Sequence, residues 1–201
     1  MVKSKISVLY HGYTPLNCKS EVNIHKKYIL YVGGRKGYKN FIRFVEALAP
    51  ILVENEGLKL LCTGNKLSQE EKELLLNLKI TQKVFQSTVN EIQLMNLYKN
   101  SILLVFPSIK EGFGFPILEA WGNECSVALS NTDPFLKIAV DAAEYFDPLN
   151  IEDIRQCIGN LLSNEGSRKR LFEMGRNRVK IFIWEKSTVE HERIYRKVIM
   201  T

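Results

Sequence analysis

The chain of 201 residues lacks the features that mark several special classes of protein. Its longest apolar runs, such as Ile102 to Phe106, are far too short to cross a bilayer, and only the short stretch Ile6 to Tyr10 follows the lysines at the start. We therefore predict no transmembrane helix and no signal peptide. The four cysteines are scattered and show no paired spacing of the kind that zinc sites and redox dithiols use, so we expect a reduced, cytoplasmic protein. The three histidines are far apart, and we expect no metal site.

Positive charge is weak overall but uneven along the chain. The net charge of +6 is mild for this length, yet six basic residues gather near the C-terminus: Arg168, Lys169, Arg170, Arg176, Arg178 and Lys180. The interleaved Leu171 and Phe172 favour an ordinary helix with a solvated basic face. The alternative is a surface for anionic lipid headgroups or nucleic acid, because clustered cations are stabilised when they meet phosphates.

Short β-rich runs alternate with longer amphipathic ones, which predicts an α/β fold with a mostly parallel sheet covered by helices. The predicted strands are Ile6 to Tyr10, Tyr28 to Gly33, Leu58 to Thr63, Lys83 to Phe85, Ile102 to Phe106 and Val127 to Ser130. With 45% apolar residues the chain can bury one domain core. We divide it into a leading strand and connector at 1–27, an α/β core at 28–150, and C-terminal helices at 151–201 that wrap the core.

The segment Glu111 to Glu119 is the most informative part of the chain. It follows a predicted strand, contains Gly112 and Gly114, and continues into a helix that starts near Pro116. Glycines let the backbone approach a ligand closely, and the start of a helix attracts phosphate. Two separate carboxylates can each accept hydrogen bonds from neighbouring hydroxyls of a sugar or ribose. The combination predicts a site for a sugar nucleotide, although either glutamate alone would be an ordinary surface charge.

A second glycine-containing turn follows another predicted strand. The stretch Val32 to Asn40 contains Gly34 and the basic residues Arg35, Lys36 and Lys39. Arg35 can hold phosphate oxygens by its planar fork, and Lys39 can add a point charge near the first turn of the next helix. Since the carboxyl ends of parallel strands meet at one edge of a sheet, both turns are expected to open on the same side.

These residues resemble the C-terminal, donor-binding domain of retaining glycosyltransferases with the GT-B fold, of the family 4 type. The resemblance covers roughly Lys5 to the C-terminus and rests on YVGGRKGYKN, LKLLCTG, VNEIQLMNLYKNS, PSIKEGFGFPILEAW and AAEYFDP. It implies a Rossmann-like parallel sheet with helices on both faces, forming one half of a GT-B fold. It also implies that the N-terminal acceptor domain is absent, so that this chain alone binds donor but transfers sugar slowly or not at all.

The resemblance assigns roles to particular residues. Arg35 and Lys39 would bind the donor diphosphate and stabilise its developing charge, Glu111 would contact the transferred sugar, and Glu119 would hold the ribose hydroxyls. The catalytic set is thus Glu111, Arg35 and Lys39. The full donor-binding set is Gly34, Arg35, Lys39, Gly64, Phe85, Val89, Glu111, Gly112, Phe113, Gly114, Phe115 and Glu119, with the nucleobase near Phe85 and Val89. No cofactor or metal is implied, in keeping with the absence of an Asp-x-Asp triplet.

The implied reaction is transfer of a hexose from a nucleoside-diphosphate sugar to a saccharide or lipid-linked acceptor in cell-surface glycan synthesis. It would take place in the cytoplasm, at or near the inner face of the membrane. Segments 124–126 and 136–140 depart from the family's pattern, which leaves a non-catalytic nucleotide-sugar sensor as an alternative. The basic C-terminal helices leave a second alternative, a module that binds lipid or nucleic acid.

Overall fold

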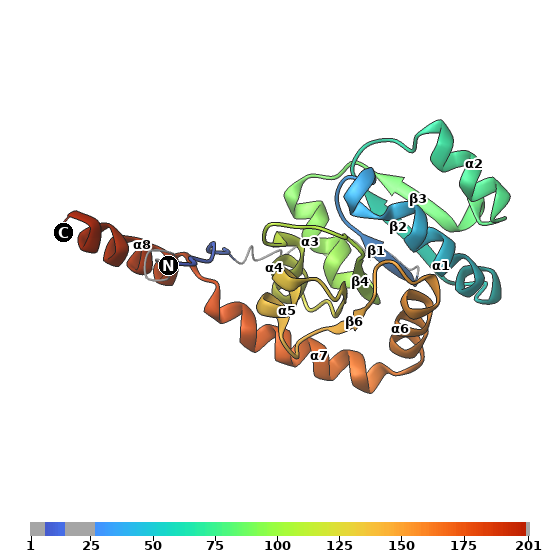
Figure 1. Ribbon diagram of the computed structural model, residues 1–201. Coiled ribbons are helices and arrows are strands. Elements are labelled where there is room, and N and C mark those ends of the chain that lie inside the picture. Colours follow the sequence, from blue (N-terminus) through green and yellow to red (C-terminus); the bar gives the residue numbers. More distant parts are fainter. Residues whose placement is uncertain (1–6, 15–26, 200–201) are drawn as a thin grey trace.

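A six-stranded, entirely parallel sheet forms the centre of the computed structural model, which describes residues 7–14 and 27–199 (Figure 1). The strands lie in the order β3-β2-β1-β4-β5-β6, so the chain adds strands in one direction from β1 and in the other direction from β4. Such a reversal between two neighbours is the place where open α/β sheets bind ligands. The strand bounds are β1 Tyr28–Tyr31, β2 Lys59–Thr63, β3 Val84–Ser87, β4 Leu103–Phe106, β5 Val127–Ser130 and β6 Glu144–Phe146.

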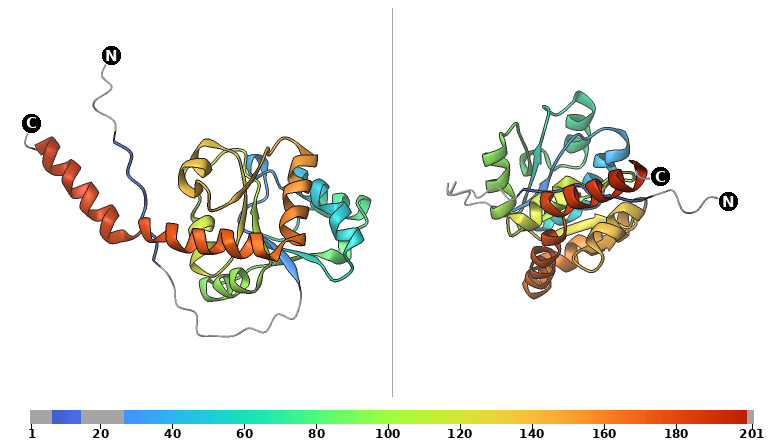
Figure 2. Two further views of the ribbon diagram at one scale, coloured as in Figure 1. Left: turned by 90° about the horizontal axis from the view of Figure 1, so that it is seen from below. Right: turned by 90° about the vertical axis from the view of Figure 1, so that its left-hand side faces the viewer.

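Helices follow each strand and cover both faces of the sheet (Figures 1 and 2). One buried apolar cluster joins a face of the sheet to α1, α2 and α6, and a second joins the other face to α3, α4 and α5. The alternating side chains of β1 divide between them, with Ile29 and Tyr31 in the first and Tyr28 and Leu30 in the second. The helix bounds are η1 Gly37–Lys39, α1 Phe41–Glu54, α2 Gln69–Asn77, η2 Thr81–Lys83, α3 Glu91–Asn100, α4 Phe115–Gly122, α5 Asp133–Ala139, α6 Ile151–Ser163, α7 Glu165–Arg178, η3 Val179–Ile181 and α8 Trp184–Ile199.

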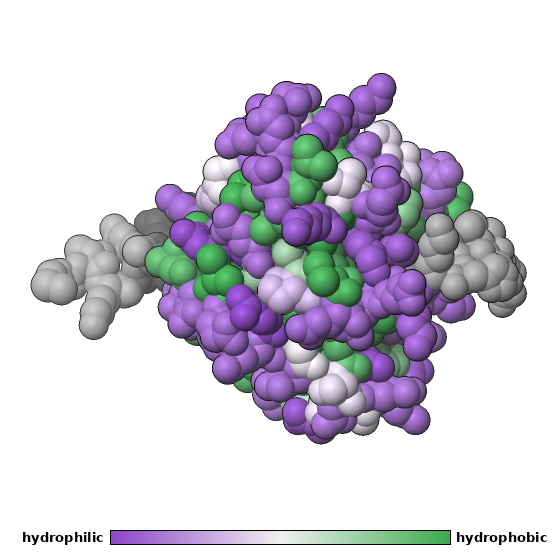
Figure 3. All heavy atoms as spheres, turned by 90° about the vertical axis from the view of Figure 1, so that its right-hand side faces the viewer, coloured by the Kyte–Doolittle hydropathy of each residue, from purple (hydrophilic) through white to green (hydrophobic). Residues whose placement is uncertain are grey.

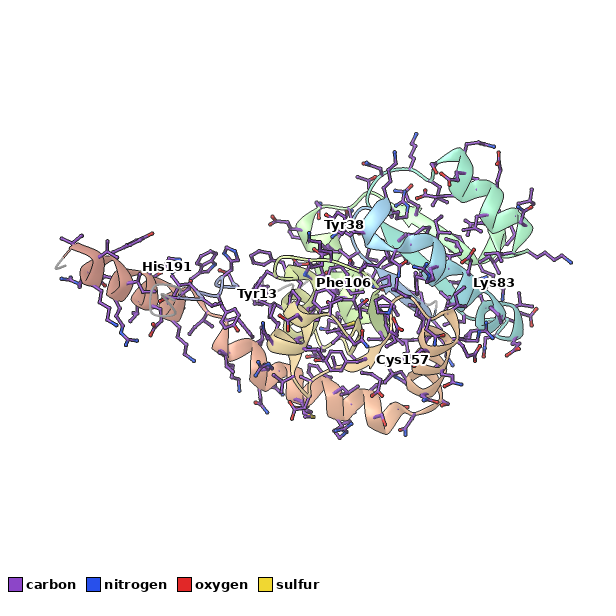
Figure 4. The ribbon with its side chains drawn as sticks, in the orientation of Figure 1. Tyr13, Tyr38, Lys83, Phe106, Cys157 and His191 are labelled. Atoms are coloured by element: carbon purple, nitrogen blue, oxygen red, sulfur yellow. The ribbon has the colours of Figure 1, made fainter. Side chains whose placement is uncertain are left out.

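The last helix projects from the body instead of wrapping it (Figures 1 and 2). Of its side chains only that of Ser187 is buried, and the apolar residues Val189, Tyr195 and Val198 are exposed. Residues 7–14 run beside its start, where Tyr13 donates its N–H to the Phe182 carbonyl at 2.7 Å. In Figure 4, Tyr13 lies at this junction between the body and α8.

Two expectations about strands were wrong. Ile6 lies outside the described residues, and Ser7 to Tyr10 form no strand, because this segment lies against the C-terminal junction and not beside a sheet edge. Most of the connector predicted to follow, residues 15–26, also lies outside the described part of the chain. In contrast, β6 pairs with β5 although no strand was predicted there from β-propensity.

The face that carries α1 and α2 is mostly hydrophilic, with apolar side chains scattered in small groups (Figure 3). Within residues 7–14 and 27–199, no helix combines the length and the apolar character that a membrane crossing requires.

Candidate functional site

The two glycine-containing turns meet at the point where the strand order reverses. Residues 32–40 follow β1 and residues 107–114 follow β4, and the backbone N–H of Ile109 donates to the carbonyl of Tyr38 at 2.7 Å. Beside this contact lies a cavity of about 790 Å³, lined by Lys39, by residues 111–116, by residues 8–11 and by the first turn of α5. The sheet edge expected from the sequence is therefore the place where the turns and a cavity coincide.

Lys39 and Glu111 form an ion pair inside this cavity. The Lys39 Nζ atom lies 2.5 Å from Oε1 of Glu111, and the two side chains are only 20% and 13% exposed. The ammonium group also lies 5.3 Å from the ring centre of Tyr38 and 5.4 Å from that of Phe106. Tyr38 belongs to η1 and Phe106 to the end of β4, and both are labelled in Figure 4. A cation held this way, with little access to water, interacts strongly with nearby negative charge.

The glycine loop takes a shape that only glycine adopts easily. Gly114 has a φ of +103°, and a Cβ atom placed there would lie 3.0 Å from atoms of both Ile117 and Phe135. Pro116 stands in the first turn of α4, where its missing N–H leaves no hydrogen bond unmade. Gly112 has open space around its Cα. The loop therefore exposes the backbone of Gly112 just before the start of α4. Phe113 and Phe115 line the cavity.

Glu119 lies one turn inside α4 and is half-buried. Its Oε2 atom accepts a hydrogen bond from the hydroxyl of Tyr98 at 2.8 Å. Burial raises the pKa of the Glu119 carboxyl, while the hydrogen bond from Tyr98 opposes that rise. Glu119 does not line the cavity that contains Lys39 and Glu111, so the two glutamates face separate parts of the surface.

Arg35 differs from the expected phosphate-binding fork. Its side chain is 4% exposed, and Nε lies 3.0 Å from Oε1 of Glu71 in α2. The remaining nitrogens donate to carbonyls at the end of β2 and in the loop after it, with Nη1 3.3 Å from the Thr63 oxygen, Nη2 3.0 Å from that of Lys66, and Nη2 also bonded to the Asn65 oxygen. The guanidinium is occupied by the protein on all three nitrogens. Arg35 is thus a buried clamp: it links the turn after β1 to α2 and to the segment around the end of β2.

Four other predicted donor-binding residues, Gly34, Gly64, Phe85 and Val89, do not line this cavity. Gly34 is exposed, and its carbonyl accepts a hydrogen bond from Tyr31 at 2.7 Å. Gly64, with a φ of +104°, packs so close to the Gly33 carbonyl that a Cβ atom would lie 3.0 Å from its oxygen. Phe85 is 39% exposed on β3, and Val89 follows that strand and packs on the second core cluster. The Phe85 ring lies 5.9 Å from the Lys59 ammonium.

Several residues at the cavity were not predicted. The His11 ring lies edge-on to the Phe113 ring at 5.3 Å and tilted to the Phe115 ring at 5.5 Å. Asp133 and Lys137 also line the cavity and pair at 2.5 Å. No sequence pattern links residues so far apart in the chain. A further cavity, of about 550 Å³, lies between residues 8–11 and α8 and contains none of the predicted site residues. Among residues 7–14 and 27–199 no three His, Cys, Asp or Glu side chains are grouped as metal ligands.

Some arginines of the basic cluster near the C-terminus make hydrogen bonds and ion pairs within the protein. Arg168 donates to the carbonyls of Leu161 and Leu162, and Arg178 donates to those of Lys137 and Ile138. Arg176 pairs with Glu173 at 3.7 Å. The contacts of Arg168 and Arg178 join α7 to α6 and to α5, which gives these two arginines a structural role.

Comparison with known proteins identifies the family. The profile of the glycosyl transferases group 1 matches residues 17–178, which is most of the chain. The chain belongs to the glycosyl transferases group 1 family. This glycosyltransferase chain is 29% identical over 162 residues to the O-antigen chain mannosyltransferase RfbU of Salmonella typhimurium, an alignment that covers 78% of the chain and 44% of the relative. It is 25% identical to the uncharacterized glycosyltransferase MJ1607 of Methanocaldococcus jannaschii, covering 96% of the chain and 54% of that protein. The chain thus spans about half the length of these curated relatives.

Solved structures share its fold. The C-terminal domain of the glycosyl transferase group 1 protein LpcC from Francisella tularensis superimposes with a TM-score of 0.67 at 22% identity, over 77% of this chain and 85% of that one. The Rossmann-like sheet with helices on both faces, as found in GT-B glycosyltransferases, is therefore confirmed. Family membership also supports a transferase, and the relatives include enzymes named for O-antigen synthesis.

Proposed function

We propose that this glycosyltransferase chain is the donor-binding half of a retaining enzyme of the family 4 type. It would bind a nucleoside-diphosphate hexose and serve transfer of the sugar to a saccharide or lipid-linked acceptor of the cell surface. The acceptor would be bound by a further domain that faces the cavity across a cleft, as in the two-domain fold that the chain resembles. The names of the mannosyltransferase relatives support this assignment. The reaction would take place in the cytoplasm, at or near the inner face of the membrane.

The observation that carries the proposal is the Lys39–Glu111 pair beneath the glycine loop. A half-buried cation suits a diphosphate, and a carboxylate beside it suits the hydroxyls of the attached sugar. Both groups lie at the reversal of strand order, where this class of sheet binds ligands. Exposed backbone at Gly112 would add hydrogen bonds from N–H groups.

The proposed chemistry follows from this arrangement. The bond between the sugar carbon and the diphosphate oxygen breaks, and its electron pair stays on the diphosphate. The acceptor oxygen forms the new bond on the same face of the sugar, while its proton passes to the departing phosphate oxygen. Lys39 stabilises the charge that grows on that oxygen, and it does so from a fixed position with little water around it. Because Lys39 and backbone N–H groups meet this charge, the proposed reaction uses no metal ion.

The nucleoside would extend away from the cavity toward α3 and β3. Glu119 would accept hydrogen bonds from the ribose hydroxyls, and the base would lie near Phe85 and Val89. Arg35, which the structure shows bound to Glu71, would act through the loops it holds in place and not by touching phosphate.

Calorimetric titration of the chain with UDP, GDP and their hexose conjugates tests the proposal. We expect binding in the micromolar to low-millimolar range to one base, and we expect the Lys39→Ala variant to weaken it about tenfold or more, because a hydrogen bond to a charged group is lost. The matched control is Lys36→Ala, which removes the same charge from an exposed position in the same turn. Absence of binding to every nucleotide, or equal losses in the two variants, would contradict the proposal.

A further inference from the structure

Tyr98 is the buried neighbour that holds the Glu119 carboxylate in place. It lies in α3 and is 0% exposed, and its hydroxyl reaches Oε2 of Glu119 in α4 at 2.8 Å. A hydroxyl at the end of a rigid, fully packed ring has little freedom to choose another partner. The position of one oxygen of Glu119 is therefore set from the core, and not by the surface around it.

We propose that Tyr98 is a positioning residue for ribose recognition, one that fixes the Glu119 carboxylate so that its second oxygen faces the ribose hydroxyls. This inference rests on the proposed function, since it requires a nucleotide at Glu119. Tyr98 itself touches no ligand. It acts through the carboxylate, and it favours the ionised form, which is the form that can accept hydrogen bonds from two hydroxyls at once.

The surroundings of Glu119 explain why such a partner is needed. Burial disfavours the charged carboxylate and raises its pKa, and the negative charge of Glu91, also on α3, acts in the same direction. Tyr13 lies close enough to interact electrostatically with Glu119, and burial raises the pKa of Tyr13 to about 12, so its hydroxyl stays neutral. The Tyr98 hydroxyl opposes both effects, because its direct hydrogen bond stabilises the negative charge of the Glu119 carboxylate.

The structure offers a closely matched control. Tyr28 is also buried, and its hydroxyl donates to the backbone carbonyl of Leu97 at 2.7 Å, one residue before Tyr98. The Tyr28→Phe variant thus removes a buried hydroxyl from the same region without touching Glu119. If both Phe variants lose similar stability, any difference in ligand recognition belongs to the contact with Glu119.

The experiment measures the preference for ribose over deoxyribose. Kd is determined by calorimetry for UDP and GDP and for their 2′-deoxy and 3′-deoxy forms, with the wild-type chain and with the Tyr98→Phe, Tyr28→Phe and Glu119→Gln variants. The wild type is expected to bind the ribonucleotide at least about tenfold more tightly than either deoxy form. Tyr98→Phe is expected to reduce this preference to below about threefold, whereas Tyr28→Phe keeps it.

The same preference measured against pH separates positioning from a general loss of packing. Recognition by an ionised carboxylate is lost as the pH falls through the pKa of Glu119. Removing the Tyr98 hydroxyl raises that pKa further, so the preference of Tyr98→Phe should disappear at a higher pH than that of the wild type. Taking the ratio of ribo to deoxy affinity cancels titration of the phosphates, which both ligands share. The Tyr28→Phe profile should overlay the wild-type profile.

The outcomes distinguish a failure of the proposed role of Tyr98 from a failure of the proposed donor site. If Glu119→Gln abolishes the preference but Tyr98→Phe leaves its size and pH profile unchanged, the inference about Tyr98 is wrong and the donor site stands. If Tyr28→Phe lowers the preference as much as Tyr98→Phe does, the effect is general packing and the inference is again wrong. If the wild type binds no nucleoside diphosphate, the proposed function and the inference both fail.

Discussion

Replacing Arg35 by alanine should be among the most destabilising substitutions in the chain. The side chains of Arg35 and Glu71 are 4% and 8% exposed, and the two charged groups are 3.0 Å apart. Removing one partner of a buried ion pair leaves an uncompensated charge and costs about 3–5 kcal/mol. Three carbonyls, one at the end of β2 and two in the loop after it, also lose their donor. For a chain of this size the loss corresponds to a fall in Tm of roughly 6–20 °C.

Urea unfolding followed by circular dichroism measures this loss of stability. The control is Arg196→Ala, since Arg196 and Glu192 form an exposed pair at 2.6 Å whose removal should cost less than about 1 kcal/mol. The double variant Arg35→Met with Glu71→Leu should recover only part of the loss, because neither charge remains buried but the three carbonyls still lack their donor. If Arg35→Ala costs no more than the control, the description of Arg35 as a buried clamp is wrong.

Three further predictions concern single positions. Gly114→Ala should cost about 1–3 kcal/mol in urea unfolding and weaken nucleotide binding, because Gly114 has a φ of +103° and no room for a Cβ atom. Val140→Gly and Glu124→Gly should each raise stability by about 0.5–1 kcal/mol, since these residues have φ angles of 52° and 62° that glycine adopts without strain; a loss in both would contradict this. Burial raises the Glu119 pKa above its unfolded value, so wild-type stability should fall as pH rises through that range. Glu119→Gln should therefore be more stable than wild type at pH 7, with the advantage vanishing below about pH 4; a pH-independent difference in urea midpoint would refute this.

Local signals in the sequence were enough to place several elements. Pro116 lies in the first turn of α4, as predicted, and the predicted strand Val127 to Ser130 is β5. Lys39 and Glu111 could also be expected near one another, because each follows a parallel strand at the same edge. These predictions depend on residues only a few positions apart or on a general rule of sheet topology.

Other features of the fold and of the site depend on contacts between residues far apart in the chain, which no local pattern contains. The burial and pairing of Arg35 depend on Glu71, which is 36 positions away and lies on a helix that was not predicted. The role of Tyr98 depends on α3 and α4 packing so that its hydroxyl meets Glu119. The strand β6 has only three residues, too few to show an alternating pattern. Glu124 and Val140, which belong to segments expected to depart from the family's pattern, both take a positive φ.

The ion pair of Lys39 and Glu111 has a consequence for the order of events at the site. The carboxylate of Glu111 accepts a hydrogen bond from the Lys39 ammonium group at 2.5 Å and keeps it in its place. If the diphosphate binds Lys39 as proposed, its negative charge competes with that of Glu111 for the ammonium group, and the carboxylate becomes freer to accept hydrogen bonds from the sugar. A free sugar lacks the charge for this competition. The pair would thus couple engagement of the sugar to binding of the anion.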